Sequence, residues 1–272
     1  MVALEQYIDD CMGLGRSYFA REEALAALAC SSTALTAAIT RLIKKRRLAN
    51  PRHGFYLILR PEDQVAGAPD PIRWIDPLVR HLDLDYRVSL LRAAAFHGAS
   101  NQAAMVFQVI VPRQVRNFEI GQHRLDFIFQ SPRTFERINE GPWLDELLSE
   151  TGYAKVAGIE TTLLDCARYF HKAGGINGFA QIVKDLGKKA NPDRLAEIAT
   201  HYENSSVRRL GYMLDLAKHV LQAEALRPFV KKAKTTVMLD PSIKPLLPSL
   251  MEHFKKAPDW LLLINEPVEV EF

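Results

Sequence analysis

The chain has few cysteines, and their spacing excludes two common kinds of cross-link. Its 272 residues include only Cys11, Cys30 and Cys166, which lie far apart. No Cys-x-x-Cys pair is present, so neither a zinc site nor a disulfide framework is expected. Single cysteines in apolar stretches are usually small core residues.

Long hydrophobic runs are absent as well. No stretch approaches the roughly 18–20 apolar residues that cross a bilayer. The opening residues, MVALEQYIDD, have neither the basic start nor the apolar centre of a signal peptide. With 48% hydrophobic and 25% charged residues, the composition is that of an ordinary globular protein. We therefore expect a cytoplasmic protein with no membrane partner.

Motifs for nucleotide and nucleic-acid chemistry are missing. A nucleotidyltransferase would need a Gly-Ser dipeptide near paired carboxylates such as Asp83 and Asp85, and the chain has none. No Glu-x-Lys follows Asp126, as a nuclease of the restriction type would require. A P-loop has a glycine five residues before its Gly-Lys pair. Before the Gly-Lys at 187–188, that position is Ile182. We therefore predict no catalytic residue, no metal and no cofactor.

Acidic residues are absent from one segment, residues 31–59, which carries six Lys or Arg. Residues 1–60 hold nine basic and five acidic residues, whereas the rest of the chain holds 26 and 27. The excess positive charge therefore lies at the N-terminal end. Such asymmetry indicates a polyanionic partner for that part of the chain.

The periodicity of residues 1–60 predicts three helices followed by a β-hairpin. Residues 3–12 and 20–28 have helical spacing and helix-forming composition. Ser31 or Ser32 can cap a third helix, whose apolar positions recur at i, i+4 and i+7. Two short β-rich runs then flank the turn Pro-Arg-His-Gly. This order is the plan of a winged helix-turn-helix, whose third helix would enter the major groove.

In that plan, hydroxyl groups early in the third helix would contact base edges, and the later cations would neutralise phosphates. The predicted contacts to double-stranded DNA are Ser32, Thr33, Thr36, Thr40, Arg41, Lys44, Lys45, Arg46, Arg47, Arg52 and His53. Two alternatives remain. The basic run could be a solvated helix end that complements the helix dipole, or the winged helix could bind a protein.

The remainder predicts a second, larger domain of mixed character. Residues 61–76 are rich in proline and are expected to be a linker, and residues 77–272 are expected to form the C-terminal domain. Helices are predicted over 89–98 and through 160–222, with strands over 103–111 and 123–129. Residues 117–127 are expected to form a hairpin that turns at Gly121. Near the end, a helix is expected over 243–256 and an edge strand over 267–272. The fold class is therefore α+β, with an N-terminal winged helix-turn-helix and a larger mixed α/β domain.

A second basic group stands in the C-terminal half. It comprises Arg208, Arg209, Lys218, Lys231, Lys232 and Lys234. A solvated helix face explains such a run most simply. A second nucleic-acid contact, or a surface that acts against another macromolecule, is the alternative, and the sequence leaves both open.

Several segments together resemble a known family. The segments are VSLLRAAAFHG, GIETTLLDCARYF, SSVRRLGYMLDLA and WLLLINEPVEV. With the N-terminal winged helix, they resemble the AbiEi antitoxins of type IV toxin–antitoxin, or abortive-infection, systems. The resemblance implies a repressor that binds repeated sequences in its own promoter. It also implies a C-terminal antitoxin domain that counters a nucleotidyltransferase-type toxin without a stable complex, with the second basic group as a possible antitoxin surface.

The leading hypothesis is thus a DNA-binding autorepressor and antitoxin without enzymatic activity. One alternative is a DNA-targeted enzyme with a nuclease-like C-terminal domain, against which the missing metal motifs argue. The other is a repressor whose second domain binds a small effector.

Overall fold

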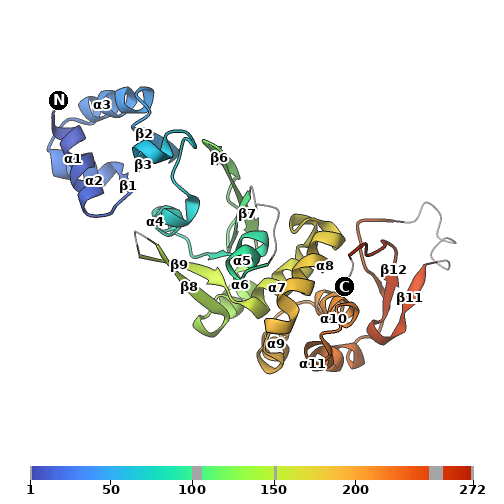
Figure 1. Cartoon of the computed structure of the whole chain (residues 1–272). Helices are drawn as coiled ribbons and strands as arrows, with labels where there is room; N and C mark the ends of the chain where they lie inside the picture. Colours follow the sequence, from blue (N-terminus) through green and yellow to red (C-terminus); the bar gives the residue numbers. More distant parts are fainter. Residues whose placement is uncertain (1, 100–105, 150–151, 245–253, 271–272) are drawn as a thin grey trace. The chain divides into compact units, whose positions relative to one another are not determined.

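A computed structural model describes residues 2–99, 106–149, 152–244 and 254–270. The fold is mixed α+β (Figure 1). Contacts divide the chain into two compact units. Unit 1 comprises residues 1–88, 105–131 and 146–156, and unit 2 comprises 89–104, 132–145 and 157–272.

Unit 1 begins with three helices and a three-stranded sheet. The elements are α1 (Val2–Gly13), β1 (Tyr18–Ala20), α2 (Arg21–Leu28), α3 (Ser32–Lys44), β2 (Leu48–Arg52) and β3 (Phe55–Ile58). The sheet has the order β1-β3-β2, and both pairings are antiparallel. A core of buried side chains, among them Ile8, Phe19, Leu35 and Ile58, joins the helices to the sheet.

The start of α3 follows the sequence rules. Ser31 is the N-cap, and its hydroxyl accepts a hydrogen bond from the Ala34 backbone N–H at 3.2 Å. Leu35, Ile39 and Leu42 are buried on one face, as their spacing predicts. The opposite face of the helix is therefore left to solvent.

The rest of unit 1 is a mixed six-stranded sheet with the order β6-β7-β5-β4-β9-β8. Its strands are β4 (Arg87–Val88), β5 (Val106–Val111), β6 (Phe118–Ile120), β7 (His123–Phe129), β8 (Leu144–Ser149) and β9 (Gly152–Ala157). The hairpin β6–β7 turns at Gly121, which has a φ of 56°. The prediction of this hairpin is confirmed, whereas β8 and β9 were not predicted. Residues 103–105 of the predicted strand 103–111 lie outside the described residues.

Residues 61–76, the expected linker, carry regular structure of their own. They contain the 3-10 turns η1 (Pro61–Asp63) and η2 (Pro71–Arg73), and α4 (Ile75–His81) begins at their end. Trp74 is completely buried, and Arg73 pairs with Asp63 at 3.2 Å. In unit 1 these residues pack with residues on both sides of them, and the division at residues 60 and 77 stays a prediction.

Unit 2 is mainly helical. Its helices are α5 (Leu90–Phe96), α6 (Pro132–Ile138), α7 (Ile159–Arg168), α8 (Gly175–Leu186), α9 (Pro192–Ala199), α10 (Asn204–Leu216) and α11 (Val220–Lys231), with the 3-10 turns η3 (Gly141–Trp143), η4 (Phe170–Lys172) and η5 (Gly187–Lys189). Asp165 of α7 is buried, and it accepts hydrogen bonds from Ser89 at 2.7 Å and from Tyr202 at 2.8 Å. These bonds tie three distant segments together.

The chain ends in a small sheet of order β10-β12-β11. Its elements are β10 (Val237–Met238), β11 (Lys255–Ala257), η7 (Pro258–Trp260) and β12 (Leu262–Ile264). The predicted edge strand is wrong for residues 267–270, which form no strand, and 271–272 lie outside the described residues. Most of the predicted helix 243–256 also lies outside them. Its last two residues belong to β11 and not to a helix.

Candidate nucleic-acid interface

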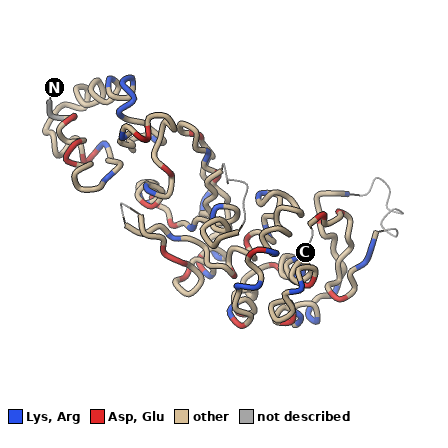
Figure 2. Tube along the Cα trace, in the orientation of Figure 1, with Lys and Arg blue, Asp and Glu red and all other residues tan. Residues whose placement is uncertain are grey.

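The solvent-facing side of α3 carries hydroxyl groups followed by cations. Ser32, Thr33, Thr36, Thr40 and Lys44 are all exposed. Ser32, Thr36, Thr40 and Lys44 follow one another at intervals of four residues, and Thr33 precedes Thr36 by three, so they lie on one helical face. No acidic residue occurs on the helix. Hydroxyl groups lie toward the N-terminal end of the helix. The Lys and Arg residues gather at its C-terminal end (Figure 2).

Two of the hydroxyl groups on this face, those of Thr36 and Thr40, already donate to backbone carbonyl oxygens. Thr36 Oγ1 donates to the Ser32 carbonyl oxygen at 2.8 Å, and Thr40 Oγ1 donates to that of Thr36 at 2.8 Å. The Arg21 guanidinium, from α2, lies against the same turn and donates to Thr36 Oγ1 at 2.7 Å. Because their protons are used internally, Thr36 and Thr40 offer acceptor oxygens and methyl groups to a partner.

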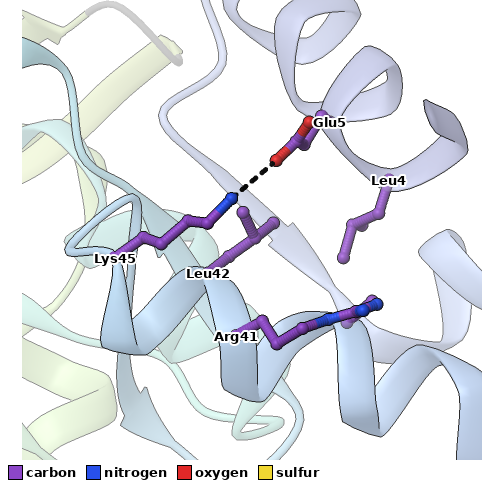
Figure 3. Close-up of a pocket in the computed structure, with 6 residues that line it drawn as sticks. Leu4, Glu5, Arg41, Leu42 and Lys45 are labelled. Carbon is purple, nitrogen blue, oxygen red and sulfur yellow. Dashed lines mark ion pairs between the residues drawn. The ribbon is translucent and has the colours of Figure 1, made fainter. Parts of the chain in front are cut away.

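The cations of the basic run do not share one environment. Lys45 approaches Glu5 of α1 at 3.7 Å, and Arg47 approaches Asp9 at 3.4 Å. Arg41 and Lys45 line a groove of about 200 Å³ between α1 and α3, in which the Lys45 and Glu5 side chains point toward each other (Figure 3). Lys44 has no ion pair with any described residue. The positive charge at Lys45 and Arg47 is therefore partly compensated, and that at Lys44 is not.

The helix ends in a Schellman turn that is occupied by an arginine. The N–H of Arg47 donates to Leu42 O at 2.9 Å, and the N–H of Arg46 donates to Ile43 O at 3.0 Å. Arg46 has a φ of 54°, in the left-handed region that favours glycine. An exposed arginine thus occupies a backbone conformation that glycine would adopt with less strain.

His53, in the turn between β2 and β3, is exposed, whereas Arg52 just before it is half-buried. The Arg52 guanidinium carbon lies 4.2 Å from the centre of the Phe118 ring on β6, and Nη2 donates to the Arg116 carbonyl oxygen. Burial lowers the pKa of Arg52, and the neighbouring Arg116 lowers it further. The predicted phosphate contact therefore has intramolecular partners in this structure.

Two predicted members of the second basic group are not on the surface. Arg208 and Arg209 are only 3% and 4% exposed. Arg208 donates to the carbonyl oxygens of Thr235 and Leu261, each at 3.0 Å. Arg209 donates to those of Leu239 at 2.7 Å and Ala167 at 3.0 Å. The prediction that these arginines form part of an exposed surface is wrong.

The partners of the two arginines explain their burial. Their donors bond carbonyl oxygens of Thr235, Leu239 and Leu261, which flank strands β10 and β12, and of Ala167 on α7, so the buried guanidinium groups are hydrogen-bonded. Burial lowers the pKa of Arg209 to about 10, which leaves it charged at neutral pH.

The lysines of that group are exposed but lie at the two ends of α11. Lys218 precedes the helix, whereas Lys231, Lys232 and Lys234 are at its C-terminal end. At about 1.5 Å per residue, the two ends are roughly 20 Å apart. Lys231 and Lys232 therefore form a patch from which Lys218 is separate.

Within the described part of the chain, no group of three or more His, Cys, Asp or Glu side chains is arranged to hold a metal ion. Among the same residues, no single helix is both long and apolar enough to cross a bilayer.

Sequence reasoning missed Arg21, Arg116 and Phe118. Arg21 stands in a stretch that reads as an exposed helix start, and its contact with Thr36 spans 15 positions. The Arg52–Phe118 contact joins residues 66 positions apart. No local pattern signals contacts of this kind.

Comparison with known proteins gives one family match and a similar solved structure. Residues 87–216 match the family model described as the AbiEi antitoxin C-terminal domain. No curated protein matches the chain. The fold is similar to one titled "Crystal structure of RV2827C protein from Mycobacterium tuberculosis", with a TM-score of 0.63 and 14% identity over 97% of this chain and 91% of that chain. At that identity, the likeness shows the fold alone.

The matched domain places the protein in the class of antitoxins of toxin–antitoxin, or abortive-infection, systems. The match over residues 87–216 supports an AbiEi-family antitoxin.

Proposed function

We propose that this protein is a DNA-binding autorepressor and the antitoxin of a type IV system. The observation that supports DNA binding is the exposed, acid-free face of α3, with hydroxyl groups at one end and cations at the other. In this proposal α1 to β3 act as a winged helix-turn-helix. Helix α3 enters the major groove, and the β2–β3 turn is the wing.

In this proposal, different residues contact the DNA bases and the DNA phosphates. Thr33, Thr36 and Thr40 would meet base edges through acceptors and methyl groups, whereas Arg41, Lys44 and Arg46 would neutralise phosphates. Lys45 and Arg47 contribute less, because Glu5 and Asp9 offset their charges. The Arg52 guanidinium contacts phosphate only after it leaves Phe118.

The target proposed for this surface is a repeated sequence in the promoter of the protein's own gene. The full chain should bind a duplex from that promoter more tightly than a scrambled duplex, and it should repress a reporter placed behind it. Equal affinity for both duplexes, with no repression, would remove the autorepressor role.

The antitoxin role is assigned to residues 77–272, with DNA binding in residues 1–60. The AbiEi match supports an antitoxin role, and we propose a nucleotidyltransferase-type toxin as the target. The protein would counter it without a stable complex and without catalysis of its own. The exposed Lys231 and Lys232 are the proposed antitoxin surface, because Arg208 and Arg209 are buried.

Co-expression with a nucleotidyltransferase toxin of the proposed type, scored by colony survival, tests this role. The full chain should restore survival, and the two proteins should not co-purify. Survival that requires a co-purifying complex would contradict a type IV mechanism.

A further inference from the structure

Arg21 contacts both elements that the proposed function assigns to DNA. It is the first residue of α2. Its backbone N–H donates to the Gly54 carbonyl oxygen, in the turn between β2 and β3, at 2.8 Å. Its side chain reaches the first turn of α3. One residue therefore connects the turn of the hairpin with the start of the helix.

The side-chain contacts of Arg21 converge on two residues. Nη2 lies 2.9 Å from both the carbonyl oxygen and Oγ of Ser32, and 2.7 Å from Thr36 Oγ1. Thr36 Oγ1 is thus an acceptor from Arg21 and a donor to Ser32 at the same time. With both roles filled, its rotamer is fixed, and its methyl group and remaining lone pair keep one direction.

Helix electrostatics do not explain this placement. The N-terminus of a helix carries a partial positive charge, so a cation beside the first turn of α3 is unfavourable there. Glu23, the nearby acid on α2, is paired with Arg16 at 2.7 Å and not with Arg21. Arg21 therefore acts on the first turn of α3 through its directed hydrogen bonds and not through its charge.

We propose that Arg21 is a positioning residue for sequence discrimination. It holds the Ser32 and Thr36 hydroxyl groups in a fixed orientation relative to the hairpin turn, so that α3 presents one pattern of acceptors and methyl groups. This role rests on the proposed DNA-binding function. Arg21 would not contact DNA itself but would orient the residues of α3 that do.

The test measures the affinity for two DNA duplexes and the ratio of the two affinities. Two duplexes of equal length are used, one selected by the wild-type protein from a random pool and one scrambled. Arg21→Ala should lower the ratio of the two affinities about tenfold, since couplings between contacting residues reach this size. The affinity for the scrambled duplex and its salt dependence should stay unchanged. Arg21→Lys should keep part of the ratio, because an ammonium still donates to Ser32 and Thr36.

Arg16→Ala is the matched control. It removes one positive charge from the same region, but the Arg16 side chain pairs with Glu23 and lies over the Tyr18 ring, away from the Ser32 and Thr36 hydroxyl groups. It should leave the ratio unchanged. The thermal transition of each variant shows whether the fold is kept, and Arg21→Lys takes the place of Arg21→Ala if the latter unfolds.

A double-mutant cycle tests whether Arg21 acts through Thr36. Thr36→Val keeps the shape and removes the hydroxyl, so Arg21→Ala should cost little more in that background. Equal losses on both duplexes, with a salt slope smaller by about 0.9, would make Arg21 a phosphate contact and overturn the proposal. An unchanged ratio would overturn it as well. A wild-type protein that selects no sequence would remove the proposed function itself, and this inference with it.

Discussion

Lys44 and Lys45 are adjacent in sequence but have different surroundings. Lys45 pairs with Glu5 at 3.7 Å, whereas no described residue pairs with Lys44. Exposed ion pairs are weak, but a carboxylate that stays near Lys45 reduces the field it presents to a phosphate. Replacing each lysine in turn therefore compares an unpaired with a paired cation at the same end of α3.

Lys44→Ala should weaken binding to a random duplex about three- to tenfold, and Lys45→Ala should weaken it less, because Lys44 releases more counterion on binding. Titration of the full chain against one labelled duplex at fixed salt measures both. Glu5→Gln should strengthen binding slightly, since it frees Lys45. A larger loss at Lys45 than at Lys44 would show that the face of α3 has been assigned wrongly.

Arg46 offers a residue-scale test in which stability and affinity change in opposite directions. Its φ of 54° costs about 1 kcal/mol for a side chain other than glycine. Arg46→Gly should therefore raise the free energy of unfolding by about that amount and at the same time weaken DNA binding. Denaturant titration and duplex binding give the two readouts. Arg46→Asn, which tolerates the same backbone, separates the loss of charge from the change in strain.

At the scale of elements, periodicity predicted the helices and little of what joins them. Leu35, Ile39 and Leu42 placed α3 correctly, and the helices α7 to α10 fall within the predicted helical region. Strand β8, LDELLS, has three leucines among its six residues but no clear alternation of buried and exposed positions, so no pattern revealed it. Its place in the sheet depends on strands that are distant in sequence.

The burial of Arg208 and Arg209 shows where sequence reasoning about a site fails. Charged residues are mostly exposed, so an arginine pair on a helix reads as surface. Here their partners are carbonyl oxygens up to 53 residues away, and those partners exist only once the C-terminal segment has packed. By contrast, the exposed face of α3 was predictable, because it follows directly from the buried face.

Helix α10 therefore carries a stability prediction. Gly211 packs against Trp260 so closely that an added Cβ would lie 2.1 Å from the ring, while Arg209 satisfies two carbonyl oxygens of its neighbours. Gly211→Ala and Arg209→Ala should each lower the free energy of unfolding by about 2–4 kcal/mol. Thermal and denaturant unfolding measure this. Lys231→Ala, an exposed change, should stay within about 0.5 kcal/mol. Equal effects of all three would contradict the packing described for α10.

At the scale of the whole molecule, the proposal divides two activities between two parts of the sequence. The charge-reversed variant Lys44→Glu should lose repression and keep at least part of its protection against the toxin. Lys231→Glu together with Lys232→Glu should do the opposite. A promoter reporter and colony survival score the two activities, with equal thermal transitions as the folding control. If Lys44→Glu abolished protection as completely as repression, protection would operate only through repression, and a separate antitoxin surface would have to be abandoned.

The central claim, that the exposed face of α3 is a duplex-DNA interface, is tested most directly by the salt dependence of binding. The full chain is titrated with one duplex over a range of salt concentrations. The slope of log K against log salt is compared for the wild type and for a variant with Arg41, Lys44 and Arg46 replaced by Ala. The matched control replaces Lys188, Lys255 and Lys256, which are exposed in unit 2, and loses the same net charge.

Each phosphate contact contributes about 0.9 to the slope. The α3 variant should therefore have a slope smaller in magnitude by about 2 to 3, and the control should match the wild type. A wild type that does not bind, or a control whose slope falls as much as that of the α3 variant, would contradict the account.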